Sequence, residues 1–270
     1  MLALRDVVKR FPTEAGDSVQ ALAHVSLEME EASFLVVIGT NGSGKSTLLN
    51  AIAGTFPADE GTIHLAGQEI TRWPEHRRAR LIGRVFQNPF SGTAPSMTVA
   101  ENLALALRRG RPRRFGWALG SRVRSELRDR VAGLGMKLEE RMETPIGLLS
   151  GGQRQALTLL MATLLRPQLL LLDEHTAALD PKSADQVIRL TTQVVERERL
   201  TTLMVTHSMQ QAASVGDRLV MMHQGRVTLD CRGAEKRRLR PDELLLRFED
   251  LRRSELLNES VAELIRAAYV

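Results

Sequence analysis

Residues 39–47 read Gly39-Thr40-Asn41-Gly42-Ser43-Gly44-Lys45-Ser46-Thr47 and directly follow the apolar run 34–38. This order matches the pattern GxxxxGK(S/T), in which a glycine-rich loop joins a buried strand to a helix and surrounds phosphate groups with backbone N–H groups. The glycines permit a tight turn and a close approach to the anion that a Cβ would prevent. Lys45 is expected to reach the β- and γ-phosphates, and Ser46 to bind Mg²⁺. The loop therefore predicts that the chain binds a nucleoside triphosphate.

Composition narrows the class of protein. The chain has 270 residues, of which 43% are hydrophobic, so it can bury a full core in one large domain or in a domain with an appendage. Its only cysteine, Cys231, cannot pair within the chain, which suits a reducing compartment. Charge enters at Arg5 and Asp6, and no uncharged apolar run approaches the roughly 18 residues of a membrane-spanning helix. We therefore expect no secretory segment, and any membrane role to be peripheral.

The formal net charge of +5 is concentrated in two places. One is a cluster near the C-terminus with Lys236, Arg237, Arg238 and Arg240. The other is a run of arginines at Arg108, Arg109, Arg111, Arg113, Arg114, Arg122 and Arg124. With one Tyr and seven Phe, the chain has few rings that could stack on bases. The charge therefore favours a solvated or membrane-facing basic surface over a surface that binds nucleic acid.

The hydrophobic patterns predict a sheet domain that is interrupted by helices. Strands are expected over 4–8, 22–29, 34–38, 61–67, 169–172 and 201–206. Helices are expected over 99–109, 122–133, 153–165 and 183–197. We therefore predict a domain over 1–232, with an α/β core in about 1–90 and 165–232 and an inserted helical subdomain in about 91–164. Residues 233–270 are expected to form a C-terminal tail with amphipathic helices over 242–253 and 255–268.

Two acidic residues, Asp173 and Glu174, follow the apolar run 169–172 at the strand end where open α/β sheets bind ligands. Asp173 is expected to hold Mg²⁺, directly or through water, and Glu174 to act as the general base for the attacking water. An ordinary acidic pair at a strand end is the alternative, which the upstream phosphate loop disfavours. His207 follows the next strand. A lone histidine is more often structural, but its place at the same sheet edge favours a contact to the γ-phosphate.

Two further polar stretches point to the same chemistry. Gln87 ends another apolar stretch and carries an amide that can touch both a metal and a water. Leu149-Ser150-Gly151-Gly152-Gln153 places a serine and two glycines at the start of a helix, which makes a second anion-binding terminus. Two phosphate sites with one catalytic carboxylate pair are reconciled by a head-to-tail dimer. Each ATP would then be held by the first loop of one subunit and the second loop of the other.

The order of these motifs resembles that of ABC-type ATPases, over about residues 2–230. The matching stretches are Gly39–Thr47, Gln87, Leu149–Gln153, Leu169–Glu174, Ala178-Leu179-Asp180 and His207. The resemblance implies an α/β P-loop NTPase fold, with a RecA-like core, an antiparallel β layer and an inserted α-helical subdomain that carries the LSGGQ stretch. It also implies an ATP-sandwich dimer. In that dimer Ser150, Gly151, Gly152 and Gln153 serve the partner's nucleotide, and Asp180 lies in the loop that links the two sites.

The same resemblance assigns three further residues. Phe11 matches the aromatic residue that stacks on adenine, although most relatives carry Tyr there and a core or turn Phe is the alternative. Gln87 is implied to sense the γ-phosphate and the transport subunits, and to bind Mg²⁺ together with Ser46 and Asp173. His175 stands where relatives commonly have Pro after the catalytic Glu. Because both carboxylates are intact, we expect activity, while the geometry of the following loop stays open.

The expected function is that of the energy subunit of a transporter, with ATP and Mg²⁺ as cofactors. The chain has one ATPase unit, no membrane span and a helical insertion of ordinary size. The expected partners are a second copy or a homologous ATPase, permease subunits and, indirectly, a periplasmic or lipoprotein binding protein, at the cytoplasmic face of the inner membrane. Uptake is favoured over export of lipid or lipoprotein. A soluble ABC ATPase acting on nucleic acid or ribosomes is the other alternative, but such proteins have tandem units or long coiled-coil insertions.

Two finer expectations concern the cargo and the permease. The stretch Asp173–Pro181 and the arginine-rich insertion are similar to those of ATPases that serve amino-acid-like solutes. The segment 87–97, with Phe90 and Met97 as apolar contacts, is expected to form the groove that receives a cytoplasmic helix of the permease. The cargo itself cannot be read from this chain, because the permease and the binding protein select it.

Overall fold

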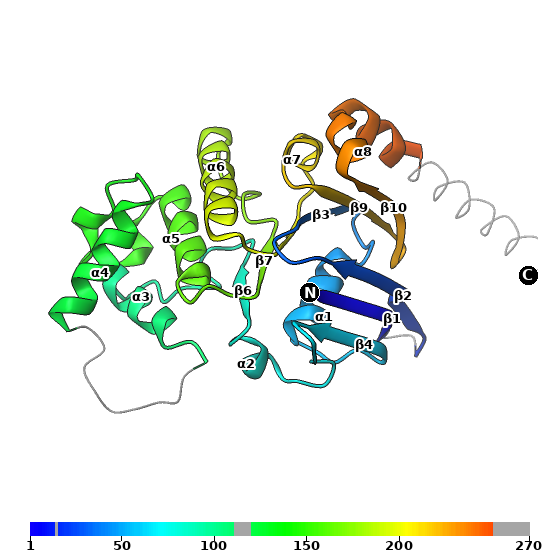
Figure 1. Ribbon diagram of the computed structural model, residues 1–270, viewed down its shortest axis with the longest axis horizontal. Coiled ribbons are helices and arrows are strands. Elements are labelled where there is room, and N and C mark those ends of the chain that lie inside the picture. Colours follow the sequence, from blue (N-terminus) through cyan, green and yellow to red (C-terminus); the bar gives the residue numbers. More distant parts are fainter. Residues whose placement is uncertain (14–15, 111–119, 251–270) are drawn as a thin grey trace, which may run out of the picture.

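Two β-sheets and the helices that cover them make up the described part of the chain (Figure 1). The computed structural model describes residues 1–13, 16–110 and 120–250. Residues 241–250 are helical, which agrees with the described part of the predicted helix 242–253. The predicted helix 255–268 and three of the arginines lie outside the described residues, namely Arg111, Arg113 and Arg114.

The larger sheet has six strands in the order β10-β9-β3-β8-β7-β6. Its strands are β3 (Phe34–Gly39), β6 (Ile82–Val85), β7 (Leu169–Asp173), β8 (Thr202–Val205), β9 (Arg218–His223) and β10 (Arg226–Arg232). β10 is antiparallel to β9, and all other neighbouring strands are parallel. Every residue of β3 and β8 is buried, as expected for continuous apolar strands in a parallel sheet that is covered on both faces.

The smaller sheet is antiparallel and has four strands in the order β2-β1-β4-β5. Its strands are β1 (Leu2–Pro12), β2 (Ser18–Met29), β4 (Glu60–Leu65) and β5 (Gln68–Glu69). Helix α1 (Lys45–Ala53) lies between the two sheets. Its residues Leu48 and Ile52 share one apolar cluster with Leu4 of the smaller sheet and Val37 of the larger sheet. The expected antiparallel layer on an α/β core is therefore present.

The remaining helices lie outside the two sheets. The long ones are α3 (Val99–Leu107), α4 (Ser121–Ala132), α5 (Gly151–Thr163) and α6 (Pro181–Glu198). The short elements are α2 (Glu75–Arg78), α7 (Met209–Ser214), α8 (Gly233–Arg238), and the 3-10 turns η1 (Glu139–Arg141) and η2 (Ile146–Leu148). In Figure 1, α3, α4 and α5 gather at the end of the molecule away from the smaller sheet. All three fall within the predicted helical subdomain.

Side-chain caps set the starts of α3, α5 and α6. Ser150 forms a capping box with Gln153 at the start of α5, as Thr98 does at the start of α3. At the start of α6, Asp180 Oδ1 accepts a hydrogen bond of 3.0 Å from the backbone N–H of Ser183. These caps explain why α5 and α6 begin at residues 151 and 181, earlier than the apolar periodicity indicated.

A buried arginine fixes the far end of α1. The Arg78 guanidinium donates hydrogen bonds to the carbonyl oxygens of Ala51 and Ile52, at 2.6 and 2.8 Å, and to those of Thr71 and Trp73, both at 2.9 Å. The side chain is 1% exposed, and burial lowers the pKa of Arg78 to about 10, so it stays charged at neutral pH. The helix that begins at Lys45 is thereby held at its other end by α2.

The first part of the predicted tail packs on the core. Leu239 and Leu244 belong to the apolar cluster that also contains Cys231. Lys236 was expected on a basic surface, but it is 2% exposed and donates a hydrogen bond of 2.6 Å from its ammonium group to the carbonyl oxygen of Ala213. Lys236 therefore belongs to the core and not to the expected basic surface.

Candidate nucleotide-binding and catalytic site

The predicted phosphate loop runs from the end of β3 to the start of α1. Gly44 has a φ of 98° and Gly42 a φ of 77°, both in the left-handed region that favours glycine. A Cβ at Gly44 would lie 2.4 Å from the carbonyl oxygen of Ala21. Glycine is therefore required at Gly44 for both conformation and space, which agrees with the motif.

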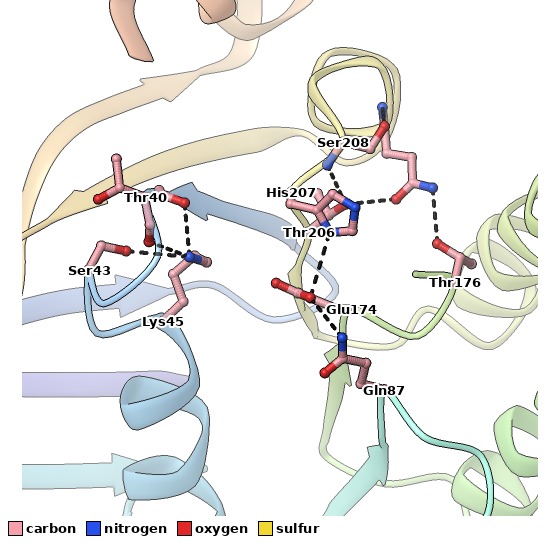
Figure 2. Close-up of polar contacts among 11 residues, drawn as sticks. Thr40, Ser43, Lys45, Gln87, Glu174, Thr176, Thr206, His207 and Ser208 are labelled. Atoms are coloured by element: carbon pink, nitrogen blue, oxygen red, sulfur yellow. Dashed lines mark hydrogen bonds and ion pairs between the residues drawn. The ribbon is translucent and has the colours of Figure 1, made fainter. Parts of the chain in front are cut away.

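Lys45 turns its amine back into the loop. Its Nζ donates hydrogen bonds to the carbonyl oxygens of Gly39 at 2.9 Å and Thr40 at 2.8 Å (Figure 2). Burial lowers the pKa of Lys45, while the charges of Glu174 and Asp173 act in the opposite direction. The ammonium group is thus held in the loop and stands in the field of the two predicted carboxylates.

Three predicted catalytic residues meet beside this loop. Glu174 Oε2 accepts a hydrogen bond of 3.2 Å from Gln87 Nε2 and lies 3.6 Å from His207 Nδ1 (Figure 2). Glu174 has a φ of 42°, a left-handed conformation that is uncommon for a residue with a side chain and recurs at functional sites. Strands β6, β7 and β8 bring together these side chains, which are far apart in the sequence.

Asp173 has a partner that the sequence analysis missed. Its Oδ2 accepts a hydrogen bond of 3.2 Å from Arg84 Nη2, and both side chains are largely buried. Burial raises the pKa of Asp173, and the Arg84 guanidinium opposes this effect. Arg84 also stacks on Phe86, with 4.6 Å from its guanidinium carbon to the ring centroid. The signal for this residue was a single arginine within the otherwise uncharged strand β6.

The residues predicted to bind Mg²⁺ suit that ion. Among the described residues there is no group of three or more His, Cys, Asp or Glu side chains that could hold a metal without other ligands. The predicted donors are instead the Ser46 hydroxyl, the Asp173 carboxylate and the Gln87 amide oxygen, which stays available because the amide nitrogen faces Glu174. Mg²⁺ prefers such oxygen ligands and completes its shell with water and phosphate. The donor set therefore fits.

The second predicted phosphate-binding terminus lies at the start of α5. A Cβ at Gly152 would lie 3.1 Å from Cβ of Ser183, so glycine allows α5 to pack closely on the first turn of α6, where Asp180 is the cap. A cavity of about 240 Å³ borders Ser150, Gly152, Gln153 and Ser183. Within the described part of the chain, no hydrogen bond of Ser150 or Gln153 reaches residues 39–47.

Phe11 lies at the end of β1 with a partly exposed ring. The residue is 36% exposed, and its ring makes an edge-to-face contact with Phe56 at a centroid distance of 5.2 Å. The Lys9 ammonium lies 5.4 Å from the Phe11 centroid and is anchored by Asp59 at 2.8 Å. Phe11 is thus held by its neighbours while part of it stays open to solvent, which suits a residue that stacks on a base.

His175, which departs from the pattern of the resembling family, is part of the core. It is 2% exposed, and its Nε2 lies 3.1 Å from Thr191 Oγ1 on α6. The Thr191 hydroxyl already donates to the carbonyl oxygen of Val187 at 2.8 Å, so His175 Nε2 must be the protonated nitrogen and donate to Thr191. Burial lowers the pKa of His175 to about 4, which keeps the ring neutral.

Comparison with known proteins gives the relatives of this chain. Residues 22–177 match the protein family described as ABC transporter. The tyrosine transport ATP-binding protein of Clostridioides difficile (strain R20291) is 43% identical over 249 residues, which cover 92% of this chain and 99% of that protein. The sulfate/thiosulfate import ATP-binding protein of Mycobacterium tuberculosis (strain ATCC 25618 / H37Rv) is 35% identical over 228 residues, covering 84% of this chain. This chain spans 60% of the length of that second relative.

Solved structures with the same fold are ATP-binding cassettes. A dimeric cassette bound to ADP and Pi in a post-hydrolysis state superposes with a TM-score of 0.73 at 27% identity, covering 86% of this chain and 98% of that chain. An ATP-binding cassette of an ABC transporter superposes with a TM-score of 0.76 at 25% identity, covering 93% and 98% of the two chains. These matches confirm the predicted P-loop NTPase fold.

We predict that His175 makes the folded state sensitive to mild acid. Because its pKa falls from about 6.5 in the unfolded chain to about 4 in the folded chain, the unfolded state binds the proton first and stability is lost as the pH falls through this window. The free energy of unfolding should drop by about 2 kcal/mol between pH 7 and pH 5 on account of this residue. Urea titrations of wild type and His175→Gln at both pH values measure the difference, which should be smaller by about that amount in the variant. His24→Gln, at an exposed position, is the control; equal pH dependence in all three proteins would contradict the prediction.

Proposed function

Since this chain belongs to the family of ABC transporter ATP-binding proteins, and is therefore an ATPase, we propose that it is the energy-coupling subunit of an importer for a small solute. The observation that supports ATP hydrolysis is the contact of Glu174 with Gln87 and His207 beside the phosphate loop. A base, a neutral amide and a histidine at that position are the groups needed to orient and deprotonate a water opposite a γ-phosphate.

The roles of the individual residues follow from their chemistry. The backbone N–H groups of residues 39–47 surround the phosphates, and Lys45 neutralises the β- and γ-phosphates from within the same loop. Glu174 accepts the proton of the attacking water, and His207 donates to the γ-phosphate. Phe11 stacks on the adenine. Mg²⁺, held by Ser46, Asp173 and Gln87, would neutralise charge on the phosphate oxygens.

We propose that the active form is a dimer in which each ATP is shared. Supporting this, the LSGGQ terminus of α5 makes no hydrogen bond to the phosphate loop of its own chain within the described residues, and a solved relative is described as dimeric with ADP and Pi. Ser150, Gly151, Gly152 and Gln153 would then face the partner's nucleotide. Asp180, which caps α6 beside Gly152, would lie at the dimer interface between the two sites.

The permease would dock in a groove of about 560 Å³ between the core and the helical subdomain. Residues 89 and 91–94 line it, as do the exposed Leu105 on α3 and the partly buried Arg109. The two expected apolar contacts, Phe90 and Met97, lie outside this lining. The Phe90 ring is exposed and packs on Arg154, with 3.8 Å from the guanidinium carbon to the ring centroid. We propose that a cytoplasmic helix of the permease occupies this groove.

The cargo and the location follow from relatives rather than from residues that touch a solute. The tyrosine transport relative, which matches this chain over nearly its whole length, supports an amino-acid-like solute. Among the described residues, no helix combines the length and the apolar character needed to cross a membrane. We propose that the subunit sits at the cytoplasmic face of the membrane through its permease, and that a separate binding protein delivers the solute.

The first prediction from this proposal concerns the general base. Glu174→Gln keeps the shape of the side chain but cannot accept a proton, so ATP hydrolysis by the isolated chain should fall at least about 100-fold while ATP affinity stays within about threefold. Turnover and nucleotide binding are measured on the same preparation, with the exposed Glu196→Gln as the matched control. A Glu174→Gln variant that keeps more than about a tenth of wild-type turnover would show that another group takes the proton.

A second prediction tests the shared site by mixing two inactive variants. Lys45→Ala should lose nucleotide affinity, whereas Ser150→Arg should bind ATP but fail to dimerise. A heterodimer then has one site with both intact loops, so the mixture should hydrolyse ATP faster than either variant alone. Melting temperatures should show that Ser150→Arg stays folded, because loss of a helix cap costs only about 1 kcal/mol. Absence of complementation at every mixing ratio would argue against the dimer.

A third prediction tests the groove. Leu105→Asp places a carboxylate on its exposed wall, where an apolar helix would have to bury it unpaired. Wild type and the control Leu246→Asp, which changes an exposed leucine outside the groove, should copurify with a multispanning membrane protein from native membranes, and Leu105→Asp should not. Hydrolysis by the isolated subunit should be the same in all three. Copurification of the same membrane protein with Leu105→Asp would place the docking surface elsewhere.

A further inference from the structure

A chain of hydrogen bonds runs behind the catalytic residues and involves side chains with no role so far. Thr206 Oγ1 lies 2.8 Å from Gln211 Oε1, and Gln211 Nε2 donates to Thr176 Oγ1 at 3.0 Å. Thr206 immediately precedes His207, and Thr176 is the second residue after Glu174. Figure 2 shows both threonines beside the catalytic pair. One amide thus bridges the two loops that hold the proposed base and the proposed phosphate-binding histidine.

The Gln211 side chain makes this bridge in place of a capping-box hydrogen bond at the start of its own helix. Ser208 caps α7 by accepting from the backbone N–H of Gln211 at 3.3 Å, and in a capping box the side chain of Gln211 would bond back to the backbone N–H of Ser208. That N–H instead donates to Thr206 Oγ1 at 3.1 Å. The Gln211 amide is therefore free of its own helix and spans to residues of the β7 and β8 loops.

The two catalytic side chains need such support, because their direct contact is weak. Glu174 and His207 approach only to 3.6 Å, and the His207 side chain is 63% exposed. Glu174 also has the unfavourable left-handed φ described above, which the surrounding structure must hold in place. Both residues border one cavity of about 190 Å³, and so do Thr176, Thr206 and Gln211.

We propose that Gln211 is a positioning residue for ATP hydrolysis, which fixes the spacing between Glu174 and His207 through its bonds to Thr176 and Thr206. This inference rests on the proposed roles of those two residues. Gln211 touches no reacting group itself. Its loss should lower the catalytic rate constant and leave ATP binding intact, since binding depends on the phosphate loop while a displacement of about 1 Å at the reacting groups can cost about 100-fold in rate.

The test uses the isolated full chain and Gln211→Met, which keeps the length of the side chain and removes both bonds. We expect kcat for ATP hydrolysis to fall at least about tenfold, with KM for ATP within about threefold and the melting temperature within a few degrees of wild type. Gln210→Met changes the exposed neighbour on the same helix and should match wild type. A Gln211→Met variant with more than half of wild-type kcat, or with losses of kcat and thermal stability together, would overturn the proposal.

Substitutions at Thr176 identify the bond that matters, and they remain usable should Gln211→Met fail to fold. Thr176→Val should lower kcat, and Thr176→Ser should keep it near wild type. In a double-mutant cycle, Thr176→Val combined with Gln211→Met should be little worse than Gln211→Met alone, because both changes break one bridge. Additive losses, or equal activity of the Val and Ser variants, would overturn the proposal. Glu174→Gln is measured in parallel: if it is inactive while Gln211→Met is normal, only this inference fails, whereas an active Glu174→Gln refutes the assigned base itself.

Discussion

The structure depends on the parallel pairing of four buried strands. β6 pairs with β7, β7 with β8 and β8 with β3, all in the same direction. The carboxyl ends of parallel strands meet at one edge of a sheet, so Gln87, the pair Asp173 and Glu174, His207 and the phosphate loop must all emerge there. Apart from the neighbours Asp173 and Glu174, these groups are far apart in the sequence. Their meeting is a property of the strand order, and the apolar runs of these strands favour their burial within a covered sheet.

Charged side chains at this edge lose hydration on burial, and neighbouring opposite charges offset part of that cost. Burial disfavours the charged form of both Lys45 and Asp173, and each favours the charged form of the other. Arg84 supplies a further positive charge for Asp173. His175, one residue beyond Glu174, differs from them because it is buried as a neutral ring. It contributes a hydrogen bond rather than a charge. The segment after the two carboxylates is thus anchored without adding to their field.

The motifs of the site could be predicted from the sequence because each is encoded in a short local pattern. Three features are each recognisable within a stretch of about ten residues: the phosphate loop, the acidic pair after an apolar strand and the capped start of α5. The periodicity of the strands and helices placed them in an α/β core. The contacts that could not be predicted join side chains far apart in the chain. Arg84 meets Asp173 across 89 positions, and Gln211 meets Thr176 across 35. The packing of Phe90 on Arg154 is another such contact, between residues 64 positions apart.

The position of Arg84 has a consequence for how such a protein can diverge. Arg84 lines the groove, and its guanidinium is also the counter-ion of Asp173. A substitution there that suits a differently shaped partner also changes the charge beside a predicted metal ligand in the same step. A substitution of Arg84 that alters the groove must therefore be accompanied by a second change that compensates the charge of Asp173. Arg84 therefore couples any change in the groove to the charge at the catalytic edge.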